Sequence, residues 1–204
     1  MDRYRHDARF NIEREDDMDD WNTALRRGAV SGALASVLST AALAALGRIG
    51  TGSMAAPTNA ISHWLWGEQA AHRDRPSLRY TATGYLIHHA SATFWAVLFQ
   101  RFAGTRLDRQ GPGATLAAST AMSAVACFAD YRLTPERLRP GYEKRLSQPS
   151  LALVYGAFGL GLAAGALMTR PPARIKPGAR DANRSPRAQS HSDPGRFDGH
   201  GPHR

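Results

Sequence analysis

Residues 146–169 read LSQPSLALVYGAFGLGLAAGALMT and contain no Asp, Glu, Lys or Arg. A helix of about 20 apolar residues spans the hydrocarbon core of a bilayer, so this stretch predicts a transmembrane helix. Four further charge-free stretches cover residues 28–47, 49–67, 80–100 and 110–129. All charged residues lie outside these five stretches, although 21% of the chain is charged. This segmentation predicts an all-α, multi-pass integral membrane protein rather than a soluble basic domain.

Four of the stretches are apolar enough to be transmembrane helices. The expected spans cover about residues 28–47, 80–100, 114–131 and 151–168, within a membrane domain of residues 28–169. Trp21 and Arg26–Arg27 precede the first span and Arg101 follows the second, as aromatic and cationic anchors do at a membrane interface. The third span is rich in Ala, Ser and Thr, so we expect it to be the inner helix of a four-helix bundle.

The stretch 49–67, IGTGSMAAPTNAISHWLWG, is uncharged but contains polar and helix-breaking residues. Pro57, Asn59 and His63 make insertion through hydrocarbon costly, because no water is available there to satisfy polar groups. Trp64 and Trp66 carry amphipathic rings that prefer headgroup depth. We therefore expect an interfacial or re-entrant segment rather than a fifth span.

Polar tails flank the membrane domain. Residues 1–27 include the acidic block Glu13–Asp20, and we expect them to form a mobile acidic tail. Residues 170–204 are basic and rich in Pro and Gly, which predicts a disordered tail. Lys and Arg are more numerous in the two tails and the loop 101–113 than in the other two loops. The positive-inside rule then predicts that both termini are cytoplasmic.

Composition excludes several classes of function. The formal net charge is +9, but the arginines are scattered over every loop and tail, so we expect no nucleic-acid partner. The one cysteine, Cys127, excludes an internal disulfide and a Cys-based zinc site. The sequence lacks GxxxxGK[ST], HExxH and GxSxG, the motifs of nucleotide hydrolysis, zinc proteolysis and serine hydrolysis. We therefore expect no enzyme activity, no cofactor and no bound metal.

His88 and His89 are the most polar residues within any expected span. Ionisable groups inside a membrane are functional candidates, but adjacent helical residues point about 100° apart, so only one ring can face a shared pocket. His63, in the interfacial segment, is the one further histidine that could act with them. We favour a hydrogen-bonded packing histidine, and the alternatives are a proton-linked function and a metal or haem ligand.

A charged loop follows Asp130 at the end of the third span. Thr134–Pro135 predicts the start of a short helix and Pro140–Gly141 its end. Asp130 could pair with Arg132 or Arg137, which would make the loop a charged staple between two helices. The alternative is contact with anionic lipid headgroups or with a partner through the cations of the loop, Arg132, Arg137, Arg139, Lys144 and Arg145.

Glycines mark close helix contacts in the first and fourth spans. Two GxxxG pairs and two further glycines are present: Gly28 and Gly32, Gly161 and Gly165, and Gly156 and Gly159. Glycines four residues apart share one helix face and let a second backbone approach. We favour packing within the bundle over dimerisation.

Three features together resemble small multi-pass inner-membrane proteins of Gram-negative bacteria of the YagU type. They are the Gly28–Gly32 opening of the first span (GAVSG), the histidine-bearing second span with Phe94–Trp95, and the loop Asp130–Pro135 (DYRLTP). The resemblance extends over about residues 26–170 in organisation. It implies a bacterial inner-membrane location and a stress-related role, because that family is linked to acid resistance, and it transfers no catalytic residue.

We expect a non-enzymatic accessory or envelope-stress protein, surrounded by the lipid bilayer and able to associate with itself or with a membrane partner. One alternative is a small transporter or channel subunit with a proton-sensitive histidine, which predicts a cavity that reaches His88 or His89. Another is a membrane redox or enzyme subunit.

Overall fold

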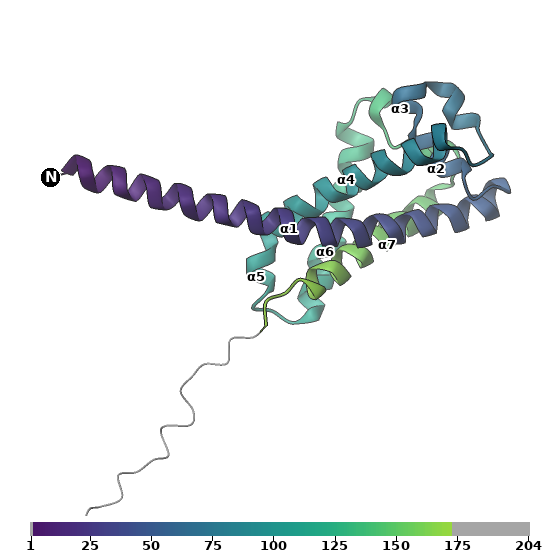
Figure 1. Ribbon diagram of the computed structural model, residues 1–204. Helices are drawn as coiled ribbons and strands as arrows, with labels where there is room; N and C mark the ends of the chain where they lie inside the picture. The colour runs from purple at the N-terminus through teal and green to yellow at the C-terminus, as the bar shows by residue number, and fades with distance from the viewer. Residues whose placement is uncertain (1, 173–204) are drawn as a thin grey trace, which may run out of the picture. The chain divides into compact units, whose positions relative to one another are not determined.

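The regular structure of the described part of the chain is helical (Figure 1). The computed structural model describes residues 2–172, apart from the side chains of residues 2–17 and 19. The long helices are α1 (Asp2–Thr51), α4 (Thr83–Phe99), α6 (Pro112–Phe128) and α7 (Gln148–Met168). The short α-helices are α2 (Ala56–Ile61), α3 (His63–Trp66) and α5 (Thr105–Leu107). The 3₁₀ helices are η1 (Glu68–His72), η5 (Glu136–Leu138) and η6 (Tyr142–Lys144), and the π-helical turns are η2 (Leu78–Ala82), η3 (Gln100–Gly104) and η4 (Ala129–Leu133). The described residues contain no strand, which confirms the predicted all-α fold class.

Proline marks the start of three of these helices. Pro57, Pro112 and Pro149 occupy the first turns of α2, α6 and α7. A proline at this position costs no helical hydrogen bond, because the first N–H groups of a helix have no partner within it. The residues before α6 and α7, Gly111 and Ser147, have extended backbone, so each helix begins sharply after a turn.

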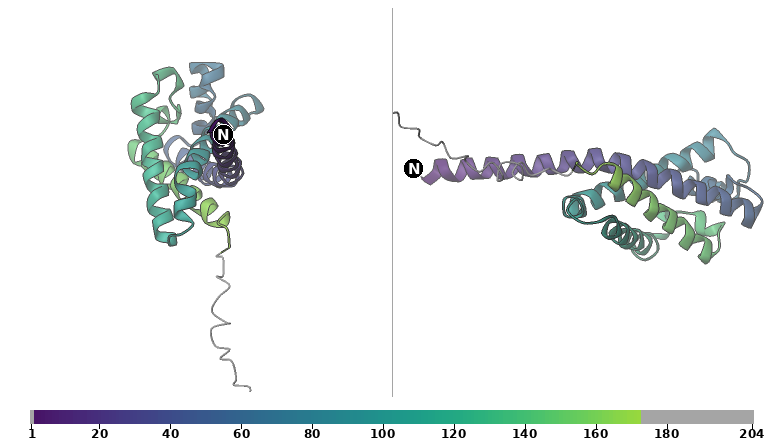
Figure 2. Two further views of the ribbon diagram at one scale, coloured as in Figure 1. Left: turned by 90° about the vertical axis from the view of Figure 1, so that its left-hand side faces the viewer. Right: turned by 90° about the horizontal axis from the view of Figure 1, so that it is seen from below.

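Helix α1 packs against both α4 and α7, and α7 also packs against α6 (Figure 2). At one end of the bundle, Arg27 of α1 contacts Asp108 after α5, and Arg170 after α7 donates to the carbonyl of Leu107. At the other end, Lys144 bonds to Glu68. The chain therefore runs along the bundle four times, in α1, α4, α6 and α7.

Among the described residues, three helical segments are long and apolar enough to cross a membrane. They are Asp20–Thr51, Pro112–Leu133 and Gln148–Met168. The expected span 80–100 corresponds to α4, which has 17 α-helical residues between two π-helical turns. With these two turns the helix runs from Leu78 to Gly104, but it is not among the three segments that are both long and apolar enough. The predicted number of four spans is therefore not confirmed.

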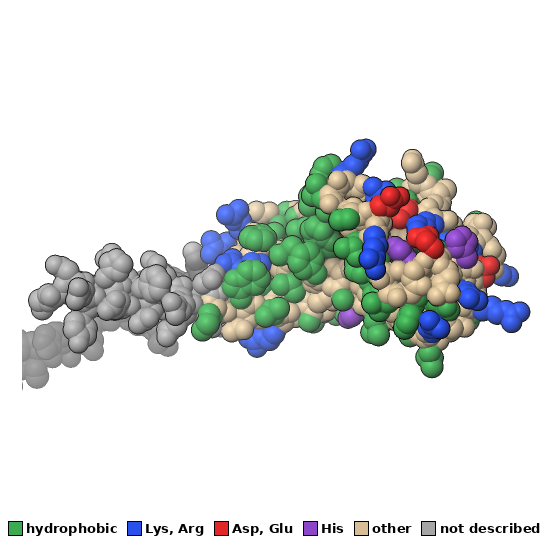
Figure 3. Space-filling view, turned by 90° about the horizontal axis from the view of Figure 1, so that it is seen from above, with side chains coloured by type: hydrophobic (Ala, Val, Ile, Leu, Met, Phe, Trp, Pro, Cys, Tyr) green, Lys and Arg blue, Asp and Glu red, His purple; other side chains and the backbone are tan. Residues whose placement is uncertain are grey.

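The side chains are distributed as lipid contact requires. Small polar residues are buried between the helices, and Ser31, Ser39 and Ser119 are all 0% exposed. Many large apolar side chains face outward, with Phe128 58% and Leu160 57% exposed. Figure 3 shows apolar side chains over the middle of one face and most charged side chains toward its two ends. Soluble proteins bury their large apolar residues most often, so the arrangement fits a bundle surrounded by lipid.

Helices α1 and α7 meet at backbone contact, and two predicted glycines allow it. A Cβ atom added to Gly161 would lie 2.5 Å from the Cα of Ala35. A Cβ atom on Gly165 would overlap Ser31, one turn earlier in α1. Any side chain at either position would push the two helices apart.

The other predicted packing glycines divide into two groups. Gly28 and Gly32 allow α1 to approach α4 as closely, so both GxxxG pairs serve contacts within this chain. A Cβ atom added to Gly159 would lie 3.3 Å from the Cβ of Ser123 on α6, which is closer than most Cβ contacts but less severe than at the other two pairs. Gly156 faces open space, so it takes no part in these contacts.

We had expected a boundary at residues 27–28, between an N-terminal tail and the first membrane helix. The structure has no helix boundary there. Helix α1 begins at Asp2, and Ala24 and Arg27 are already buried. Residues 1–27 contain neither Pro nor Gly, so the sequence offers no break in the helix. The tail predicted for residues 170–204 lies outside the described residues from residue 173 onward.

The segment 49–67 packs against the bundle. It contains the end of α1 and then α2 and α3, and every residue of α2 is buried. The Asn59 side chain is fully buried, donates to the carbonyls of Arg73 and Arg75, and accepts from Thr81. These bonds satisfy the polar group that would make free insertion into lipid costly.

Candidate functional site

A cavity of about 440 Å³ lies among α4, η4, α7 and the loop 134–142. Aromatic residues from several elements form much of its wall: Trp64, Phe94, Trp95, Tyr142, Tyr155 and Phe158. Its polar residues are few: Ser39, His88, Ser91, Asp130 and Thr134. Apolar walls with a small number of polar groups are typical of sites that bind small molecules.

His88 is held by a hydrogen bond across two helices. Its Nε2 atom lies 2.7 Å from the Oγ of Ser39 on α1. The Ser39 hydroxyl has a single proton and two backbone carbonyls of its own helix within reach, that of Ala35 at 2.7 Å and that of Ser36 at 3.2 Å. We therefore assign the proton of the His88–Ser39 bond to Nε2, which leaves Nδ1 as an acceptor in the neutral ring.

Asp130 ends a chain of tyrosine hydroxyls. The hydroxyl of Tyr142 donates to that of Tyr155 at 3.0 Å, and Tyr155 donates to Oδ2 of Asp130 at 2.6 Å. Ser123 of α6 donates to the backbone carbonyl of Tyr155 and so fixes this part of α7. Burial raises the pKa of Tyr142 well above its ordinary value, because the phenolate would lose its hydration. Tyr142 therefore stays a donor throughout the physiological pH range.

The structure brings two of the predicted polar candidates, His88 and Asp130, to one cavity. His89 does not line the cavity, and its ring stacks on Tyr85, as the 100° step between adjacent helical residues requires. His63 is buried elsewhere, with Nδ1 2.8 Å from the carbonyl of Ala60. His63 lines a neighbouring hollow with Glu68, and Trp64 borders both this hollow and the cavity.

The predicted pairing of Asp130 with Arg132 or Arg137 is wrong. Within the described residues Asp130 forms no ion pair, and its hydrogen-bond donor is Tyr155. The π-helical turn η4 turns Asp130 toward α7, whereas Arg132 and Arg137 are exposed.

The loop that follows Asp130 does act as a charged staple through its cations. It links two loops, however, and not two helices. Lys144 donates to Glu68 at 2.5 Å, and Arg145 forms an ion pair with Asp74. The hydrogen bond from Lys144 lowers the pKa of Glu68. Trp64 adds a further link, because its indole N–H donates to the carbonyl of Arg139 at 2.9 Å.

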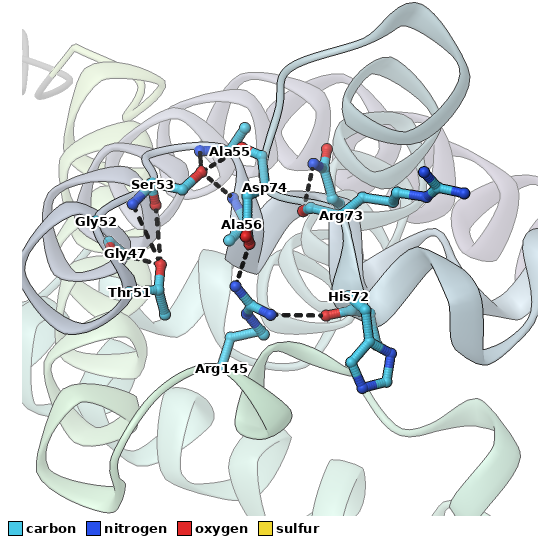
Figure 4. Close-up of polar contacts among 12 residues, drawn as sticks. Gly47, Thr51, Gly52, Ser53, Ala55, Ala56, His72, Arg73, Asp74 and Arg145 are labelled. Atoms are coloured by element: carbon cyan, nitrogen blue, oxygen red, sulfur yellow. Dashed lines mark hydrogen bonds and ion pairs between the residues drawn. The ribbon is translucent and has the colours of Figure 1, made fainter.

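Figure 4 shows how Arg145 joins this staple to the end of α1. Its guanidinium reaches Asp74 and also donates to the carbonyl of Ala71. Ser53, just after α1, donates to the backbone carbonyl of Asp74 and accepts from the N–H groups of Ala55 and Ala56. This network holds the loop 134–142, which forms part of the cavity wall, against the rest of the bundle.

Sequence reasoning missed Ser39, Tyr142 and Tyr155, which position the two candidate groups. A serine in an Ala-rich helix and a tyrosine in an apolar span carry no local sign of their partners. The one available signal was that Tyr155 is the most polar large side chain within its expected span, residues 151–168.

In the range that the structure describes, no group of three or more His, Cys, Asp and Glu side chains lies close enough together to hold a metal ion.

Fold and site together define a helical protein with segments able to cross a membrane and with a largely apolar, aromatic cavity. No protein-family model matches the chain, and no curated protein or solved structure is significantly similar to it. The likeness to the YagU type stays a prediction from the motifs.

Proposed function

We propose that the protein is a multi-pass protein of a bacterial inner membrane that binds a small, mainly apolar molecule in the cavity beside His88 and Asp130. The observation that carries this proposal is the cavity itself, in which two polar candidates meet an aromatic wall. Its volume of about 440 Å³ falls in the range of sites for small ligands. We place both termini in the cytoplasm, on the support of the excess of Lys and Arg in the tails.

The proposed role is binding without catalysis. Ser39 and His88 are a serine and a base at hydrogen-bond distance, which is the start of a nucleophilic site. However, Ser39 is 0% exposed and its proton is engaged with the carbonyl of Ala35. A nucleophile must reach its substrate, so this pair supports positioning of the His88 ring rather than attack. A non-enzymatic accessory or stress-response role in the envelope is consistent with this chemistry.

The binding experiment uses the full chain in lipid nanodiscs and the neutral fluorescent probe N-phenyl-1-naphthylamine. Ala129 lines the cavity, so Ala129→Trp should fill it and abolish the protein-dependent fluorescence. Ala121→Trp is the matched control, because Ala121 is exposed on α6 outside the cavity. Equal probe binding by both variants and the wild type would contradict the proposal.

A second candidate function is proton-linked transport, which the placement of His88 in the cavity favours. The Nδ1 atom of His88 can take up a proton without loss of the bond to Ser39. Proteoliposomes with an imposed pH gradient should then accumulate the bound molecule, and His88→Gln should abolish the accumulation. Binding without accumulation would support the accessory role and oppose transport.

A further inference from the structure

We infer that the ligand of this cavity is an organic cation with an apolar body, for which Asp130 is the counter-ion. This inference rests on the proposed function, because it names the class of molecule that the cavity binds. Three independent features carry it: the balance of charge around the cavity, the direction of its hydrogen bonds, and the aromatic wall.

The charge balance around the cavity is negative. No Lys or Arg is among the residues that line it. Asp130 forms no ion pair within the described residues, and Glu143 lies close enough to interact with it electrostatically. The Oε2 atom of Glu143 is buried and forms no hydrogen bond in the described part of the chain. The two cations that follow it, Lys144 and Arg145, are engaged with acids of the other loop.

Carboxylates that are largely buried without a counter-charge are unfavourable, and a bound cation would remove that cost. An anionic ligand would add to it. The negative charge around the cavity therefore disfavours anionic ligands, whatever contacts they make with its wall.

The hydrogen bonds of the cavity wall also favour a cationic ligand. The protons of Tyr142 and Tyr155 are both directed along the chain that ends at Asp130. Trp64 donates to a backbone carbonyl, and so does Thr134.

His88, the remaining titratable group of the wall, is bonded to Ser39 through Nε2, to which we assigned the proton of that bond. Of the side-chain donors that line the cavity, Ser91 and Trp95 alone form no hydrogen bond among the described residues. Acceptors remain open, namely Oδ1 of Asp130 and Nδ1 of His88, so a ligand that donates hydrogen bonds fits best.

The aromatic wall suits the same class of ligand. The faces of Trp and Tyr rings attract cations through their negative quadrupole, and the attraction strengthens where water is excluded. Trp64, Trp95, Tyr142 and Tyr155 come from four different elements and surround the cavity together with two phenylalanines. The wall therefore offers both apolar contact for the body of the ligand and electrostatic stabilisation for its charge.

A matched set of probes tests the inference. Benzyldimethylamine is a cation at pH 7, isobutylbenzene is its neutral isostere, and phenylacetate is an anion of similar size. Binding to the full chain in nanodiscs is followed by ligand-observed NMR against empty nanodiscs of the same lipid. We expect the cation to bind, phenylacetate not to bind, and Asp130→Asn to weaken binding of the cation by about tenfold while the neutral isostere is unaffected.

Glu136→Gln is the matched control, because it makes the same chemical change at an exposed position of the same loop that does not line this cavity. If Asp130→Asn does not give a monodisperse protein, Trp95→Leu replaces it and should weaken binding of the cation more than that of isobutylbenzene. Equal affinity of wild type and Asp130→Asn for the cation, or binding of phenylacetate, would overturn the inference. If the wild type binds neither these probes nor the naphthylamine, the proposed function fails as well.

Discussion

The guanidinium of Arg27 and the carboxylate of Asp108 form a two-point ion pair, with Nη1–Oδ2 and Nη2–Oδ1 distances of 2.8 and 2.7 Å. It joins the start of the first apolar stretch to the turn after α5, and the two side chains are only 11% and 19% exposed. The sequence had indicated a cationic anchor for lipid headgroups at this position. The structure shows that Arg27 instead ties two ends of helices together.

Asp108→Asn should destabilise the protein by about 2–3 kcal/mol, because it leaves a mostly buried guanidinium without its counter-charge. The free energy of unfolding is measured by titration of the purified protein with SDS. Arg26→Ala is the control, since Arg26 is exposed beside Arg27 and its loss should change stability by about 0.5 kcal/mol or less. Equal effects of the two substitutions would contradict the structural role of the pair.

The contact between α1 and α7 predicts that two glycine substitutions in α7 differ in their effect on stability. Gly165→Ala should lower the free energy of unfolding by about 1–3 kcal/mol, because the added methyl group overlaps Ser31 and forces the helices apart. Gly156→Ala, on the same helix but facing open space, should be neutral or stabilise the helix by up to about 1 kcal/mol. The same SDS titration compares the two variants, and a tolerated Gly165→Ala would show that the helices are not this close.

Two buried serines one turn apart in α1 should respond in opposite ways to alanine. Ser39→Ala removes the acceptor of the His88 Nε2 proton and should lower the free energy of unfolding by about 1–3 kcal/mol. Ser36 is as deeply buried, but its hydroxyl has no hydrogen-bond partner among the described residues, so Ser36→Ala should be neutral or stabilising. Thermal unfolding followed by circular dichroism ranks the variants, and the reverse order would refute the assigned bond.

Single cysteines test whether α4 crosses the membrane together with the other long helices. In a Cys127→Ala background, Gln69→Cys and Gln110→Cys place thiols at exposed positions before and after α4. A membrane-impermeant maleimide should label position 69 in intact cells and position 110 only after lysis, because the two positions lie at opposite ends of the bundle. Labelling of both from the same side would exclude α4 as a span.

Local chemistry determined much of the fold. Charge-free stretches of apolar residues can pair all their backbone groups in lipid only as helices, so the all-α class followed from the sequence. The short helix after Pro135 and the close contacts at Gly28, Gly32, Gly161 and Gly165 were also predictable, since they depend on residue type at fixed spacing. His88 was a candidate because a histidine in an apolar helix needs a partner.

The identity of each partner depended on packing between segments far apart in the chain. Nothing near Asp130 in sequence indicates Tyr155, and the cations closest to it, such as Arg132, were the natural but wrong expectation. The π-helical turn η4 rotates Asp130 toward α7, and no residue type marks such a turn. Sequence alone thus determined which segments are apolar helices, because that depends on the free energy of transferring each segment from water into lipid. Only the tertiary structure decided which polar groups share a cavity, because that depends on how those helices rotate and where they touch.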